Sequence, residues 1–88
     1  MKITYMYEFV TLAENLSYKK AASELNLAQS VLSRHINSVE NELGVKLLFR
    51  SSHEIVLTPE GEIACREFRN IVDIYKNKLE PLMTQKHE

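Results

Sequence analysis

The sequence predicts a mainly α-helical domain with a short β-hairpin and a long last helix. Between residues 3 and 43, apolar residues recur at steps of three and four, which is the spacing of amphipathic helices. Two short apolar runs, 47–50 and 55–58, then flank a polar loop, as expected for a hairpin. From residue 59 the helical spacing resumes and continues to about residue 80.

The first two helices are predicted at about residues 3–15 and 18–25. The apolar face of the first consists of Met6, Phe9, Val10, Ala13 and Leu16. Ser17 is a favourable N-cap for the second helix, whose small alanine pair at 21–22 lets another helix approach closely. Asn26 tolerates the left-handed conformation that ends a helix. We therefore expect two helices joined to their neighbours by tight turns.

The third helix is predicted to begin near Ala28 or Gln29 and to end at Gly44, since glycine favours positive φ. Because alanine is a poor N-cap, Gln29 or Ser30 is expected to cap the helix instead. Its buried stripe is Leu32, Ile36, Val39 and Leu43. Its opposite side carries short or amide-tipped polar residues with a single full charge, namely Gln29, Ser30, Ser33, Arg34 and Asn37. This side offers hydrogen bonds where a solvated helix usually shows lysine and glutamate.

The last helix is predicted to begin with Thr58 as N-cap and Pro59 at the first helical position, and Pro81 weakens it beyond. A heptad-like seam is formed by Cys65, Phe68, Val72, Tyr75, Leu79 and Leu82. Three isoleucines lie off this seam, at positions 63, 71 and 74. One interpretation is that the seam packs only onto its own domain. Because it continues past any intramolecular contact that a short chain offers, we expect it to pair two copies.

Composition leaves the class of function open. The 88 residues carry a net charge of −1 and are 44% hydrophobic, which is typical of a small folded domain. The single cysteine excludes an internal disulfide, and we expect no metal site and no cofactor. The start "MKITYMYEFV" lacks a signal-peptide cleavage site, and no apolar run approaches the ~20 residues that cross a bilayer. We expect a cytoplasmic protein, and no paired catalytic groups indicate an enzyme.

The order of three helices, a hairpin and a long helix is that of a winged helix-turn-helix. In this motif the second helix of the pair enters the DNA major groove. Glutamine and asparagine can bond adenine, arginine can bond guanine, and serine can bond either a base or a phosphate. The helix at about 29–42 is therefore predicted to recognise DNA, with Val31 against a thymine methyl. We expect Lys19, Lys20 and Arg50 to hold phosphates.

The stretches "FVTLAENLSYKKAASELNLAQSVLSRHINSVENELGVKLLFR" and "LTPEG" resemble the N-terminal domain of LysR-type bacterial transcriptional regulators. The resemblance implies a DNA-binding domain over residues 1–58, with its helix-turn-helix at about 18–37. It implies a linker helix over residues 59–88 that pairs two subunits. The expected partners are a second copy and double-stranded DNA with an interrupted dyad. A small-molecule effector is expected only if the full-length protein has a C-terminal effector-binding domain.

The sequence departs from the usual family pattern at Val31 (usually Ala), His35 (often Gln), Phe49 and His53 (often Arg). The family's Leu-Phe pair is shifted in "LLFR", so either Leu48 or Phe49 fills the corresponding pocket. Arginine is the better minor-groove probe because its charge is permanent. We therefore expect the wing loop, 51–54, to add less affinity, and DNA binding to vary with pH as His53 titrates.

An alternative interpretation is a winged-helix or coiled-coil module that binds another protein and not specific DNA. The negative net charge favours it, since phosphate neutralisation is the usual source of DNA affinity. Salt distinguishes the two, because DNA binding weakens steeply with salt and an apolar protein contact does not.

Overall fold

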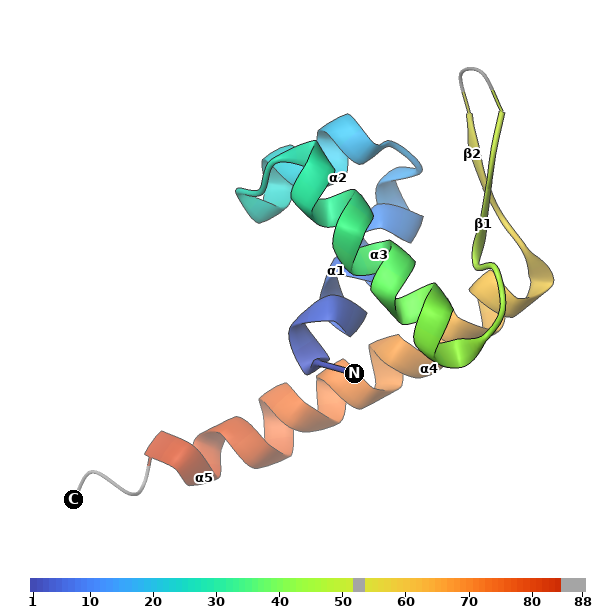
Figure 1. Ribbon diagram of the computed structural model, residues 1–88. Coiled ribbons are helices and arrows are strands. Elements are labelled where there is room, and N and C mark those ends of the chain that lie inside the picture. Colours follow the sequence, from blue (N-terminus) through green and yellow to red (C-terminus); the bar gives the residue numbers. More distant parts are fainter. Residues whose placement is uncertain (52–53, 85–88) are drawn as a thin grey trace.

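A computed structural model describes residues 1–51 and 54–84. Its elements are α1 (Ile3–Asn15), α2 (Tyr18–Leu25), α3 (Gln29–Leu43), β1 (Leu48–Arg50), β2 (Ile55–Leu57), α4 (Pro59–Ile74), the π-helical turn η1 (Tyr75–Leu79) and α5 (Glu80–Thr84). Figure 1 shows the hairpin projecting from one end of the molecule, while α4 to α5 form one long rod beneath α1 and α3. The predicted order of helices, hairpin and long helix is confirmed.

Three predicted helix ends are confirmed and one is wrong. The Ser17 hydroxyl accepts a hydrogen bond from the Lys20 N–H at 3.1 Å, and Asn26 and Gly44 end their helices with φ of 57° and 76°. The N-cap of α3 is Ala28, whose side chain cannot cap, and neither polar residue after it takes that role. The tight turn after α2 leaves Gln29 already helical, so only backbone groups close this end.

The core lies where α1 packs against α2, α3 and α4. Phe9, at its centre, is fully buried and meets the Phe68 ring edge-on at a centroid distance of 5.9 Å. Two leucines that periodicity placed on buried faces, Leu16 and Leu43, are instead 48% and 44% exposed. Both stand at the end of a helix, where the chain turns away; Leu16 itself is left-handed, with φ of 50°.

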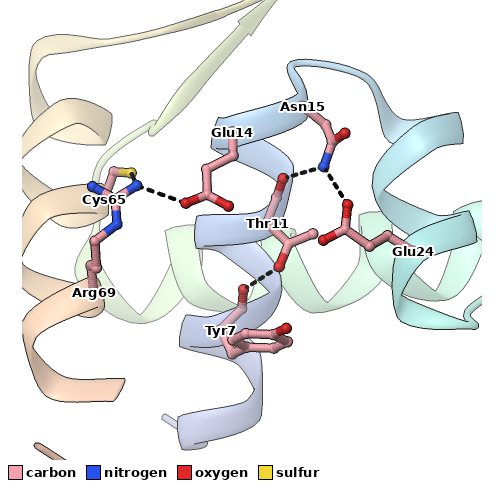
Figure 2. A network of polar contacts seen from close by, with 7 residues as sticks. All are labelled: Tyr7, Thr11, Glu14, Asn15, Glu24, Cys65 and Arg69. Atoms are coloured by element: carbon pink, nitrogen blue, oxygen red, sulfur yellow. Dashed lines mark hydrogen bonds and ion pairs between the residues drawn. The ribbon is translucent and has the colours of Figure 1, made fainter. Parts of the chain in front are cut away.

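The polar side of α1 fastens the neighbouring helices to it, as Figure 2 shows. The Asn15 amide donates to Glu24 on α2 at 3.2 Å. The Arg69 guanidinium on α4 donates to Glu14 at 3.0 Å and to the Cys65 sulfur at 3.8 Å. These exposed contacts connect α2 and α4 to the polar side of α1 and add little to the stability that the buried core provides.

The hairpin is antiparallel, with Leu48 opposite Leu57, Phe49 opposite Val56 and Arg50 opposite Ile55. Leu48 is 7% exposed and Phe49 is 61% exposed, so Leu48 fills the pocket for which the two residues compete. Successive strand residues point to opposite faces, and the phenyl ring is left outside. His53 and its predicted minor-groove role lie outside the described residues.

Gly61 shows why a glycine occurs in the first turn of α4. A Cβ built there would lie 2.0 Å from the Leu47 carbonyl oxygen. Gly61→Ala is expected to lower the free energy of unfolding by about 1–3 kcal/mol, since backbone must move to admit the methyl group. Urea denaturation followed by circular dichroism measures it, with Glu62→Ala in the same turn as the control. Equal stability of the two variants would contradict the close contact.

Candidate nucleic-acid interface

The outer side of α3 is the first component of the candidate site. Gln29, Ser30, Arg34 and Asn37 are exposed, while Val31 and Ser33 are half-buried. The stripe on the opposite side is buried as far as Val39, which anchors the helix and aims its polar side outward. The predicted division of α3 into an apolar side and a hydrogen-bonding side is therefore confirmed.

Two adjoining recesses extend this surface onto α2 and the hairpin. One of about 340 Å³ is lined by Tyr18, Gln29, Ser30, Ser33 and Arg50. The other, of about 430 Å³, is lined by Tyr18, Ser33, Asn37, Glu40, Lys46, Leu48, Phe49 and Arg50. Lys19 lines a neighbouring hollow together with Gln29 and Arg50. The structure thus brings most of the predicted contacts together. Lys20, Val31 and Arg34 line none of these three recesses.

Arg50, on β1, contacts both α2 and α3. Its Nη2 donates to the Ser33 hydroxyl at 2.9 Å, and its guanidinium lies 4.3 Å from the centre of the Tyr18 ring. A guanidinium has five N–H donors, so most remain for an anion outside the protein. The ring and the hydroxyl hold a long side chain in one orientation, which reduces the entropy that binding would remove.

Tyr18 was missed by reasoning from sequence. It is the first residue of α2 and reads there as an ordinary helix residue. Its contact with Arg50 joins residues 32 positions apart, and no local spacing predicts such a pair. The only available signal was an aromatic residue directly after a serine N-cap and before two lysines.

His35 lies on the side of α3 that faces α1, away from the candidate interface. Its Nδ1 is 2.7 Å from the buried Glu8 carboxylate, and its ring stacks on Tyr5 at a centroid distance of 4.1 Å. The departure from the usual family residue therefore concerns the attachment of α3 to α1.

Glu40 attaches the hairpin to α3. Its carboxylate is buried and accepts hydrogen bonds from the backbone N–H groups of Leu47 and Leu48, at 2.7 and 3.3 Å. Lys46 Nζ lies 3.7 Å from the same carboxylate. Because this carboxylate sets the start of β1, it also sets where Arg50 emerges beside α3.

The predicted seam of the last helix needs correction. Phe68 and Val72 are 6% and 7% exposed in the single chain, and Cys65 is half-buried and packs against the same core. They face their own α1 and leave almost no surface for a second copy. Large exposed apolar side chains of this helix are Ile63, Ile71, Ile74, Leu79, Leu82 and Met83. Three of these are the isoleucines that periodicity placed off the seam.

Within residues 1–51 and 54–84, no helix combines the length and the apolar character that crossing a membrane requires. The same residues contain no group of three histidine, cysteine or acidic side chains placed to hold a metal ion.

Residues 3–62 match the family of bacterial regulatory helix-turn-helix proteins, lysR family. The regulator XapR of Escherichia coli K12 is 42% identical over 64 residues, which are 73% of this chain and 22% of XapR. The uncharacterized regulator MJ0300 of Methanocaldococcus jannaschii is 33% identical over 87 residues, 99% of this chain and 29% of MJ0300. The chain thus spans less than a third of the length of these relatives.

The likeness extends to solved structures. The DNA-binding domain of BenM, in a complex with catB site 1 DNA, superposes with a TM-score of 0.88 at 31% identity. That match covers 100% of this chain and 98% of the BenM domain. Full-length OxyR C199D from Pseudomonas aeruginosa has a TM-score of 0.90 at 27% identity, over 100% of this chain and 30% of OxyR. By sequence and by fold, the chain belongs to the lysR family of bacterial regulatory helix-turn-helix proteins.

Proposed function

We propose that the chain binds double-stranded DNA at specific sequences as a homodimer and thereby regulates transcription. The observation that carries the proposal is the outer side of α3, whose hydrogen-bonding groups adjoin the Arg50 guanidinium and the start of α2. The structure of the BenM domain is a DNA complex, and XapR is named a transcriptional regulator. Both support this use of the surface.

The first turns of α3 supply the base contacts. Gln29 and Arg34 are exposed. The Gln29 amide offers a donor and an acceptor side by side, and the Arg34 guanidinium offers paired donors, which are the groups that discriminate bases. Ser30 adds a hydroxyl, and Val31 a methyl surface suited to thymine. Asn37 lies two turns further along the helix, in the recess lined also by Lys46, and reads a base at the edge of the contact.

Phosphate contacts come from α2 and β1, beside the start of α3. Lys19 and Arg50 line one hollow beside Gln29, where a backbone phosphate would lie next to the bases that α3 reads. Lys20, exposed on α2, holds a phosphate further out. Such contacts position the protein and set its register without reading sequence.

A second copy covers the exposed apolar side of the long helix. Ile71, Ile74 and Leu82 are 41%, 53% and 56% exposed, and large apolar side chains left open on one helix are typical of an interaction site when they form a patch. A two-fold symmetric pair places two recognition helices on one face of the duplex. The operator is then an interrupted dyad.

Selection from a library of random duplexes tests this proposal. The wild-type chain should enrich two inverted half-sites whose centres are about 10 base pairs, or a multiple of this, apart. Enrichment of a single unrepeated motif would contradict the homodimer. No enrichment over the starting library would contradict specific DNA binding, and would leave the surface to a protein partner.

Arg50→Ala is expected to weaken binding to the selected site and to random DNA alike, by about five- to tenfold, and to lower the salt dependence by about one phosphate. Tyr18→Ala should produce a smaller loss of the same kind. The Arg50 guanidinium then retains its hydrogen bond to Ser33 but no longer lies over an aromatic ring. Tyr18→Phe retains the ring and is the matched control. Fluorescence anisotropy at several salt concentrations measures all three; a wild-type affinity of Arg50→Ala would remove this residue from the interface.

A further inference from the structure

The long helix contains one turn that is not α-helical. Residues Tyr75–Leu79 form a π-helical turn, closed by a hydrogen bond from the Glu80 N–H to the Tyr75 carbonyl. In a π turn this bond spans five residues and not four, so the turn holds one extra residue. Regular helix precedes it, in α4, and follows it, in α5. The axis nevertheless continues as one rod (Figure 1).

The extra residue changes the direction in which the later side chains point around the helix axis, relative to the side chains before the turn. An α-helix advances ~100° per residue, so the one extra residue held in the π turn sets all later residues back by ~100°. Each later residue thus takes nearly the angular place of the residue before it. Around the helix axis, Leu79 and Leu82 therefore point in the directions that residues 78 and 81 would have in an uninterrupted α-helix. Together with Ile71 and Ile74 they then follow steps of three, four and three, which is one continuous helix face.

A side-chain contact agrees with this rotation. The four residues are open to a partner, with exposed fractions of 41% for Ile71, 53% for Ile74, 45% for Leu79 and 56% for Leu82. Because every residue from 76 to 83 is exposed, exposure alone does not select one face there. The Tyr75 hydroxyl contacts the Met83 sulfur at 3.7 Å, although positions eight apart diverge by about 80° in a regular helix.

Charge indicates that a second copy of the chain fits this face. Glu60 and Glu67, near the start of the helix, stand at helical spacing from Ile63 and Ile71. Lys78 stands near its end, beside Leu79. A two-fold axis between two copies brings the acidic start of one against the lysine end of the other, so the face is complementary to itself. A different protein would need to reproduce this pattern.

We propose that the π-helical turn selects the dimer interface of this chain by aligning Leu79 and Leu82 with Ile71 and Ile74, and that a second copy covers the resulting stripe. The proposal rests on the homodimer proposed above and adds which residues form it. The seam predicted from periodicity is thereby divided. Its first half packs inside the chain, and its last two leucines belong to the interface.

Deletion of Asn77, an exposed residue within the turn, tests the alignment. It removes the extra residue, so a regular α-helix then presents Leu79 and Leu82 in the same line as before. The dimer dissociation constant, from sedimentation equilibrium of the 88-residue chain, should stay within threefold of wild type or fall. If the helix carried no extra residue, the deletion would rotate both leucines away. A dissociation constant raised tenfold or more, with helical circular dichroism retained, would therefore overturn the proposal.

Leu82→Glu completes the experiment. It should raise the dissociation constant at least tenfold, both in the undeleted 88-residue chain and in the Asn77 deletion, whereas Asn77→Glu adds the same charge off the stripe and should change it less than threefold. If Leu82→Glu left the dissociation constant unchanged, the residues after the turn would lie outside the interface. A wild-type chain that stays monomeric at every concentration would reject the homodimer itself, which the deletion results alone cannot do.

Discussion

Arg34→Ala is expected to weaken binding to the cognate operator by about 1–3 kcal/mol and binding to random DNA much less. Arg34 is exposed in the second turn of α3, where a bidentate bond to guanine depends on the base present. Gln29→Ala should behave in the same way, since its amide can pair with adenine. Fluorescence anisotropy of labelled duplexes, cognate and scrambled, measures both losses at one salt concentration.

The matched control is Arg66→Ala, which removes the same side chain and charge from α4. Arg66 pairs with its neighbour Glu67 at 3.2 Å on the exposed side of that helix. It should leave both affinities within about twofold of wild type, because Arg66 lies on another element and lines none of the recesses beside α3. Equal losses on cognate and scrambled DNA for Arg34→Ala would make Arg34 a phosphate contact and not a reader of bases.

Glu40→Ala is expected to lower the free energy of unfolding by about 2–4 kcal/mol. The carboxylate is 7% exposed and accepts from two backbone N–H groups. Its removal leaves buried donors without an acceptor, at about 1–3 kcal/mol each. Glu40→Gln keeps one acceptor oxygen and should lose about half as much. Urea denaturation followed by circular dichroism, at one chain concentration because a dimer links stability to concentration, measures the effect.

Glu42→Ala is the control for this prediction. Glu42 is an exposed acid two residues further along α3, and its carboxylate meets the chain's amino terminus at 3.1 Å. A surface ion pair of this kind contributes about 0–1 kcal/mol. If Glu40→Ala cost no more than Glu42→Ala, the carboxylate would not be what attaches the hairpin to α3.

Local rules predicted the helices because local chemistry decides their ends. The ends of α1 and α2 agree with the predicted ranges, and the Thr58 hydroxyl accepts from the Gly61 N–H at 2.9 Å as its cap position requires. Gly61 itself is unfavourable by helix propensity. Its reason is a tertiary one, the Leu47 carbonyl that comes within reach only after the hairpin folds back.

In the long helix, periodicity does not predict which side chains share a face. Counting by threes and fours assumes one regular helix from residue 59 onward, and the π turn breaks that assumption at Tyr75. Periodicity also predicts that Phe68 contacts a second copy, because the sequence does not show that Phe9 on α1 covers it. Nothing in the residue pattern distinguishes burial within a chain from burial between chains.

The candidate interface divides in a similar way. The polar side of α3 was predictable because one helix face needs only its own spacing. The support beneath Arg50 was not, because Tyr18 and Ser33 reach it from two other helices. The attachment of His35 to Glu8 likewise joins α3 to α1 across 27 positions. Contacts of this range follow from how the helices pack.

The central claim is that this surface binds specific DNA, and salt-dependent anisotropy tests it most directly. Wild-type chain would be titrated onto a labelled duplex carrying the selected dyad, and onto a scrambled duplex, between 50 and 200 mM salt, a range over which several phosphate contacts lower affinity steeply. We predict tighter binding to the dyad at each salt concentration and a marked loss of affinity with salt on both duplexes. Equal affinity for the two duplexes, or binding that does not change with salt, would contradict the claim and indicate a protein-binding module.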